Sequence, residues 1–166
     1  MIKRKKNNSG FTLIEFLIYI GLFSILLFVI LQMFAAIFDV QLESEATSAV
    51  SDDGKYLLQR FTYDVNNATS ISEPNFYGTP SGTLVLVING ENVIYSSGSG
   101  NLIIENETAG TLDQLNSFGS NISNLSFIRL DGSGKDNVQI NFTLTSETIK
   151  QGGAVVKTFQ TTAGLR

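Results

Sequence analysis

An unbroken apolar run near the N-terminus limits the folds open to this chain more than any other feature. From Phe16 to Phe38 the sequence holds 23 residues, and only Gly21, Ser24 and Gln32 interrupt its apolar character. A helix of this length covers about 34 Å at about 1.5 Å per residue, enough to cross a hydrocarbon core of about 30 Å. The run therefore predicts a membrane-spanning helix.

A basic cluster precedes the run. Four of the first ten residues are positively charged, whereas residues 11–166 hold 7 basic and 15 acidic groups. The charged residues of the cluster are Lys3, Arg4, Lys5 and Lys6. By the positive-inside rule, the N-terminus stays cytoplasmic and the rest of the chain is exported. Because the body is acidic, phosphates would repel much of its surface, and we expect no general binding of nucleic acid.

Two ordinary explanations of such an N-terminus each leave one of its features unexplained. A cleaved secretory signal peptide has an apolar stretch of about 7–15 residues followed by a small-residue cleavage site, and this run is longer and lacks that site. A plain signal anchor accounts for the basic cluster and the length, but not for Glu15 at the start of the run. An acidic residue costs about 2.5–3.5 kcal/mol at the bilayer centre and less near the interface. Glu15 is therefore a candidate functional residue that needs a cationic partner.

The residues just before Glu15 suggest that partner. Cleavage after Gly10 would create a new α-amino group on Phe11, four residues before Glu15 and thus within one helical turn. The amine could pair with Glu15 of its own chain or of a neighbouring subunit, and either pairing would offset the cost of a carboxylate in lipid. An incidental acid near the membrane interface is the alternative interpretation.

The hexapeptide Gly10-Phe11-Thr12-Leu13-Ile14-Glu15, behind its basic leader, resembles the cleavage and N-methylation motif of type IV prepilins and pseudopilins. The resemblance covers residues 1–38. It implies that a membrane-embedded prepilin peptidase cuts after Gly10 and methylates Phe11. It also implies that Glu15 serves docking at the membrane assembly platform and recruitment of other pilin or pseudopilin subunits.

The subtype within this family is indicated by weaker features. Many major pilins close a C-terminal loop with a disulfide, which a chain without cysteine cannot do. Gln59–Val65, followed by Asn67-Ala68-Thr69, is similar to the helix end of minor pseudopilins of the type II secretion class, and Phe159–Thr162 is similar to their sheet-terminating segments. We therefore favour a minor pilin or pseudopilin over a major subunit. A membrane-anchored extracytoplasmic binding module or enzyme is the alternative, and it would need neither the Gly10-Phe11 junction nor Glu15.

Helical spacing continues after Phe38 in a more polar composition. Apolar residues recur at intervals of three, four or seven, which is typical of an amphipathic helix. These residues are Ala46, Val50, Leu57, Phe61, Val65 and Ala68. Gly54 costs about 1 kcal/mol relative to Ala and is predicted to be a kink or a local break, while the preceding Asp52-Asp53 is interpreted as a solvated face.

The rest of the chain predicts a sheet. A β-branched run at 83–88, the Asn89-Gly90 pair and a second run at 92–96 are typical of a hairpin. Further strands are predicted at 102–104, 125–130, 138–144 and 155–160, with a short helix near 112–118. The expected fold is α+β, with a long N-terminal helix laid across an antiparallel sheet. The expected organisation is a basic leader at 1–10, a transmembrane and assembly helix at 11–38, an amphipathic helix at 39–70 and a sheet domain at 71–166.

Catalytic chemistry is not expected from this composition. The chain has no histidine and no cysteine, so the usual nucleophile–base pairs are missing, and we predict no enzyme, cofactor or metal. The segment Asp131–Asp136 has some features of a calcium loop. However, Lys135 stands where such a loop needs an oxygen ligand, so a hairpin turn is favoured and a calcium site is kept as the lesser alternative.

Overall fold

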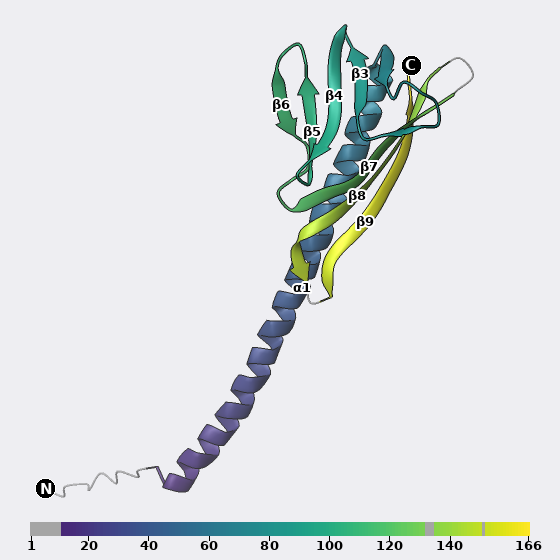
Figure 1. The fold of residues 1–166 in the computed structure, drawn as a ribbon. Coiled ribbons are helices and arrows are strands. Elements are labelled where there is room, and N and C mark those ends of the chain that lie inside the picture. The colour runs from purple at the N-terminus through teal and green to yellow at the C-terminus, as the bar shows by residue number, and fades with distance from the viewer. Residues whose placement is uncertain (1–10, 132–134, 151) are drawn as a thin grey trace, which may run out of the picture. The chain divides into compact units, whose positions relative to one another are not determined.

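A computed structural model describes residues 11–131, 135–150 and 152–166. Within these ranges one helix, α1 (Leu13–Asn67), is followed by nine strands (Figure 1). The strands are β1 (Ser70–Glu73), β2 (Pro80–Ser81), β3 (Leu84–Ile88), β4 (Glu91–Gly98), β5 (Asn101–Asn106), β6 (Thr111–Gln114), β7 (Ser120–Leu130), β8 (Asn137–Lys150) and β9 (Gly153–Gly164). The chain divides into two compact units, Met1–Val40 and Gln41–Arg166, which are taken here in turn.

The described part of the first unit is the apolar part of α1. Every side chain from Phe11 to Val40 is exposed, and the helix is long and apolar enough to cross a membrane. The hydroxyl of its single serine between Phe16 and Phe38 is satisfied internally, because Ser24 Oγ donates to the Ile20 carbonyl at 2.8 Å. A helix that is apolar on all sides is suited to lipid, and its length and composition fit the predicted transmembrane helix.

In the second unit, α1 buries one stripe against the strands. All six residues of the predicted stripe are buried, although Ala68 lies one residue past the end of the helix. Gly54 is buried within the same stripe, and the prediction of a break there is wrong because α1 runs through it without interruption. A side chain at Gly54 would overlap the ring of Phe159 on β9. Glycine at this position therefore lets the helix approach the strand closely.

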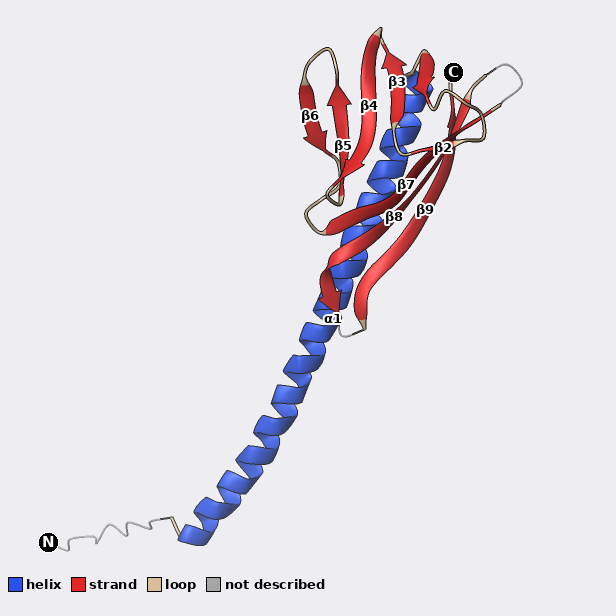
Figure 2. Cartoon of the chain, viewed as in Figure 1, coloured by secondary structure: helices blue, strands red, loops and turns tan. Residues whose placement is uncertain are grey.

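The strands form two antiparallel sheets (Figure 2). The first has the order β1-β3-β4-β5-β6 and the second has the order β2-β7-β8-β9. The expected α+β class, with a long N-terminal helix and antiparallel strands, is confirmed, but two sheets take the place of the one sheet expected. Strands β1 and β2 were not anticipated from the sequence.

The hairpins of the first sheet follow local backbone chemistry. Asn89 and Gly90 have φ of 53° and 83°, as the tight turn between β3 and β4 requires, and this confirms the predicted hairpin. The predicted helix near 112–118 is wrong, because this stretch contains the exposed strand β6. The side chain of Asn106 accepts hydrogen bonds from the Thr108 and Ala109 nitrogens at 3.1 and 3.0 Å, and Gly110 has a φ of 62°. This turn reverses the chain, and β6 pairs with β5.

The second sheet supplies the other wall of the core. The alternation on β8 is confirmed, since its predicted inward residues Val138, Ile140, Phe142 and Leu144 are all buried. Phe61 of α1 lies between the two sheets, with its ring centroid 5.0 Å from that of Tyr95, 5.7 Å from that of Phe127 and 6.1 Å from that of Phe142. One aromatic residue of the helix thus contacts strands of both sheets.

Candidate functional site

The candidate site lies at the start of α1. Gly10 and the rest of the basic leader lie outside the described residues. Phe11 precedes the helix and is exposed, with its ring centroid 6.3 Å from that of Tyr19 in an edge-on arrangement. Glu15 lies in the first helical turn and is also exposed. The structure thus puts Phe11 and Glu15 at the same end of the apolar helix.

Thr12 and Glu15 bond to each other across this first turn. Oε2 of Glu15 accepts hydrogen bonds from the Thr12 nitrogen at 3.1 Å and from Thr12 Oγ1 at 3.0 Å. In return, the Glu15 nitrogen donates to Thr12 Oγ1 at 3.3 Å. This reciprocal pattern is a capping box, which satisfies backbone donors that have no partner within the helix. Thr12 is the functional residue that our sequence reasoning missed, and the signal that could have found it is the spacing Thr-x-x-Glu.

The cap leaves part of the Glu15 carboxylate available. Both hydrogen bonds fall on Oε2, and within the described part of the chain Oε1 accepts none. The carboxylate can therefore cap its own helix and still face a second cation.

A family model for the prokaryotic N-terminal methylation motif matches residues 5–31. The matched stretch contains Gly10, Phe11 and Glu15, and it continues into the apolar part of α1. Together with the helix-and-sheet fold, this match decides the family resemblance.

Over this N-terminal stretch the chain is similar to type IV pilin-like proteins.

Comparisons with curated proteins and with solved structures find no match. The likeness to type IV pilins therefore rests on the N-terminal motif and on the fold, and the apolar helix fits anchoring in a membrane.

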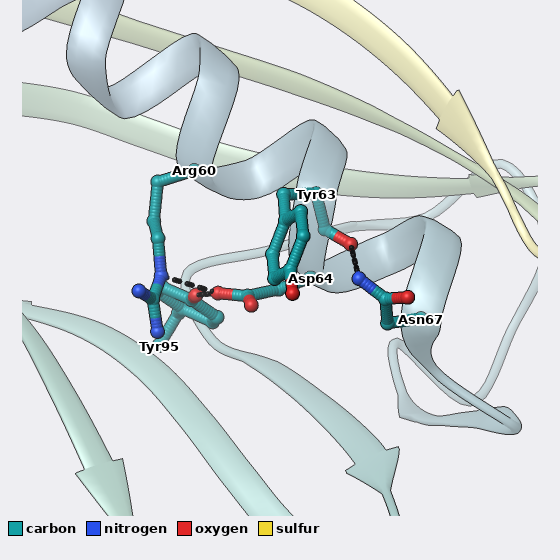
Figure 3. Close-up of polar contacts among 5 residues, drawn as sticks. All are labelled: Arg60, Tyr63, Asp64, Asn67 and Tyr95. Atoms are coloured by element: carbon teal, nitrogen blue, oxygen red, sulfur yellow. Dashed lines mark hydrogen bonds and ion pairs between the residues drawn. The ribbon is translucent and has the colours of Figure 1, made fainter.

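The C-terminal end of α1 forms a buried polar cluster with β4 (Figure 3). The carboxylate of Asp64 is buried, and it accepts hydrogen bonds from Arg60 Nε at 2.7 Å and from the hydroxyl of Tyr95 on β4. Burial, reinforced by the nearby Asp64 carboxylate, raises the pKa of the Tyr95 hydroxyl far above its usual range, so it remains a donor. Asn67 Nδ2 donates to the Tyr63 carbonyl at 2.8 Å in the last turn. These contacts fix the end of α1 to the first sheet.

A second polar cluster occupies the segment considered for calcium. Asp136 accepts hydrogen bonds from the Tyr77 hydroxyl at 2.8 Å and from Arg129 Nη2 at 2.5 Å, and the Arg129 guanidinium lies 5.1 Å from the centre of the Tyr77 ring. The hydrogen bond from Arg129 holds the pKa of Asp136 below its usual range. Residues 132–134 of the candidate loop lie outside the described residues. Among the residues that are described, no three acidic side chains are grouped as a metal site would need.

Proposed function

We propose that this chain is a structural subunit of a type IV pilus or a type II secretion pseudopilus, most simply a minor one. Prepilin peptidase cleaves it after Gly10 and methylates Phe11, and the mature chain polymerises through its N-terminal helix. The observation that carries the proposal is the combination of the Gly10-Phe11 junction with Glu15, at the start of a helix that is apolar on every side. The role is structural rather than enzymatic, and neither a cofactor nor a metal is needed for it.

The charge of Glu15 explains why cleavage of the leader comes before assembly. While the leader is attached, the Phe11 nitrogen is an uncharged amide, and four basic residues hold the leader on the cytoplasmic side. Cleavage removes these charges and creates a single cation on Phe11. An incoming subunit can then neutralise Glu15 with its own amine or with that of a neighbour. Because apolar packing alone sets the axial register of two helices poorly, this ion pair specifies the register.

The same charges define a topology. The chain crosses the cell membrane once, with its N-terminus in the cytoplasm and residues 41–166 on the far side, where they join the pilus or pseudopilus. Its partners are prepilin peptidase, the assembly platform, membrane lipid and sibling subunits. The acidic body gives no reason to expect general binding of nucleic acid.

The mass of the protein extracted from membranes tests the processing step. We expect the ten-residue leader to be lost and one methyl group to be added to Phe11. Gly10→Val should retain the leader, because the peptidase draws an extended backbone through its site and a residue without a side chain fits most easily. Processing of this variant at the wild-type rate, or an intact N-terminus on the wild-type chain, would overturn the proposal.

Two variants separate the effect of the Glu15 charge on assembly from the effect of the hydrogen bonds by which Glu15 caps the helix. Glu15→Gln retains a capping side chain but removes the charge, since Gln serves in a capping box as Glu does. Thr12→Ala removes the cap and leaves the carboxylate. If the charge sets the register, Glu15→Gln should be processed and inserted but should be absent from pili or pseudopili, while Thr12→Ala should be recovered in them. The opposite result would show that Glu15 acts only as a cap.

A further inference from the structure

A groove of mixed polar and apolar character lies in the second unit. Residues of α1 line one side of it and residues of β4, β5 and β6 line the other. Its volume is about 560 Å³, within the range of about 300–1,000 Å³ that is typical of clefts for small ligands. Most of its lining side chains are polar, and the apolar ones are Ile88, Val93, Ile104 and Leu115. We call this site the Tyr56 groove, after its aromatic residue.

Tyr56 gives the groove an uncovered aromatic surface. The residue is 46% exposed and lies four positions before Arg60, so both side chains come from the same face of α1. The ring of a tyrosine offers a flat apolar face, and its hydroxyl can both donate and accept a hydrogen bond. An aromatic ring beside polar groups suits a ligand that is apolar on one face and polar at its edge.

Asp64 brings a carboxylate oxygen that has no donor. The residue is only 4% exposed, and its Oδ2 accepts the hydrogen bonds from Arg60 Nε and from the Tyr95 hydroxyl (Figure 3). Within the described residues Oδ1 accepts none. Among the same residues, only Arg129 Nε is both closed to solvent and without a partner, so Asp64 Oδ1 is open to solvent. Because Asp64 lines the groove, this oxygen is an acceptor that a ligand can use.

Arg60 and Asp113 add groups of both kinds. Within the described part of the chain, Arg60 makes a single hydrogen bond, from Nε to Asp64, so most of the N–H donors of its guanidinium remain available. That bond also holds the guanidinium in one orientation. Asp113 lines the groove from β6, where it is exposed, and its carboxylate accepts from no described side chain. The groove therefore presents an oriented fork of donors and two carboxylates.

The charges of the groove exclude several classes of ligand. Two carboxylates stand against one guanidinium, which is already paired, so a phosphate group would be repelled. A wholly apolar ligand would cover the donors of Arg60 and the acceptors of Asp64 and Asp113 without satisfying them. A neutral ligand whose groups both donate and accept hydrogen bonds meets neither obstacle.

We propose that the Tyr56 groove binds a neutral saccharide of gluco configuration. Such a sugar ring carries its hydroxyls around the rim, while its two faces consist of C–H groups. One face packs on the Tyr56 ring, and the rim hydroxyls accept from Arg60 and donate to the carboxylates of Asp64 and Asp113. The groove lies wholly within the second unit, so this inference does not depend on filament assembly.

Saturation-transfer NMR tests the site on the full-length chain. The protein is held in a phosphocholine detergent, because detergents with sugar headgroups would compete, and the probes are cellotetraose and chitotetraose. We expect saturation chiefly at the C–H protons of the sugar faces. Tyr56→Phe should bind as the wild type, whereas Tyr56→Ala should weaken binding about tenfold. Asp113→Asn keeps the shape of the side chain but removes its charge, and it should weaken binding about fivefold. Both positions are exposed, so melting temperatures should stay unchanged.

A matched control uses Tyr63, which is 65% exposed, lies seven residues after Tyr56 on the same helix and does not line the groove. Tyr63→Ala should bind cellotetraose as the wild type does. Inorganic phosphate and tetralysine represent anionic and cationic ligands, and neither should displace the sugar. The proposal is overturned if neither oligosaccharide binds, if Tyr56→Ala binds undiminished or if Tyr63→Ala loses as much. Displacement of cellotetraose by phosphate or tetralysine would likewise reject a site for neutral saccharides.

Discussion

The two parts of α1 have the same secondary structure but are built for different surroundings. From Leu13 to Val40 all side chains are exposed and almost all are apolar. From Gln41 to Asn67 a single stripe is buried and the remaining faces are polar or charged. Both parts form a helix, but the pattern of side chains around the helix decides its surroundings. A helix that is apolar on every side is suited to lipid, and one with a single apolar stripe is suited to packing on a protein core in water.

The two parts also differ in how they use charge. The only ionisable residues between Leu13 and Val40 are Glu15, Tyr19 and Asp39. The second part contributes several carboxylates that bond to strands or loops, among them Glu43 with Lys150 at 2.7 Å and Asp53 with Ser117, in the loop before β7, at 2.7 Å. Carboxylates in the first part are thus confined to its two ends, whereas carboxylates in the second part bond to strands and loops.

Substitution of Phe61 should give the largest effect. Phe61→Ala removes a ring that is 1% exposed and contacts aromatic residues of both sheets, so we expect the free energy of unfolding to fall by about 3–5 kcal/mol. Phe23→Ala, on the apolar part of the helix, should leave the unfolding of the sheets unchanged. Denaturant unfolding of the detergent-solubilised chains, followed by the circular dichroism of the strands, measures both. Equal losses from the two variants would remove the distinction between the parts of α1.

The two glycines of the helix should respond in opposite directions. An Ala at Gly54 would overlap the Phe159 ring, so we expect a loss of about 1–3 kcal/mol in the free energy of unfolding. At Gly21 nothing lies within 4 Å of an added Cβ, and Ala there should keep or raise the helix content. Thermal unfolding measures the effect of Gly54→Ala, and the helix content in detergent measures the effect of Gly21→Ala. Combining Gly54→Ala with Phe159→Leu should recover part of the loss, and a stabilised Gly54→Ala would contradict the close packing.

The spacing of residues in the sequence is enough to predict an element when that local spacing alone determines the element's structure. The helical stripe from Ala46 to Val65, the Asn89-Gly90 turn and the alternation on β8 are each read from local spacing, and all three are confirmed. The split into two sheets could not be read in this way. It depends on pairings between segments far apart in the sequence, such as that of Pro80 and Ser81 on β2 with Ile128 and Phe127 on β7.

Errors arose where a tertiary contact determined the role of a residue. Gly54 was interpreted from its intrinsic helix propensity, but the ring of Phe159, more than 100 residues away in the sequence, decides its role. The pair Asp52-Asp53 was interpreted from its charge alone: Asp52 is exposed as predicted, but the Asp53 carboxylate is partly covered and accepts hydrogen bonds from the hydroxyls of Ser117 and Ser120. At the candidate site, a motif in the sequence predicts Gly10, Phe11 and Glu15. The capping role of Thr12 is also present in the sequence, as a Thr-x-x-Glu pattern, but was not predicted from it.

Acid should act on the second unit through its ion pairs. The hydrogen bond from Arg129 lowers the pKa of Asp136, so this pair stabilises the fold above the pKa of Asp in the unfolded chain, which is about 3.9. The contribution should be lost as the pH falls through the lower pKa of the folded state. Asp136→Asn should therefore lower stability at neutral pH and reduce its dependence on pH below about 4. Melting temperatures from about pH 2.5 to 7 measure this, and an unchanged acid slope would show that the pair does not contribute.

Removal of the apolar part of the helix should have the smallest effect on the sheets. A chain that begins at Gln41 keeps the whole buried stripe, the Asp53 anchor and the pair between Glu43 and Lys150. We expect it to be soluble and to melt within a few degrees of the full chain in detergent, since only fraying of a new helix end is added. A chain that begins at Lys55 loses Ala46, Val50 and the Asp53 anchor, and it should lose cooperative unfolding or melt much lower. If the chain from Gln41 stays unfolded, the apolar residues before it contribute to the core, and the separation between the two parts of α1 does not hold.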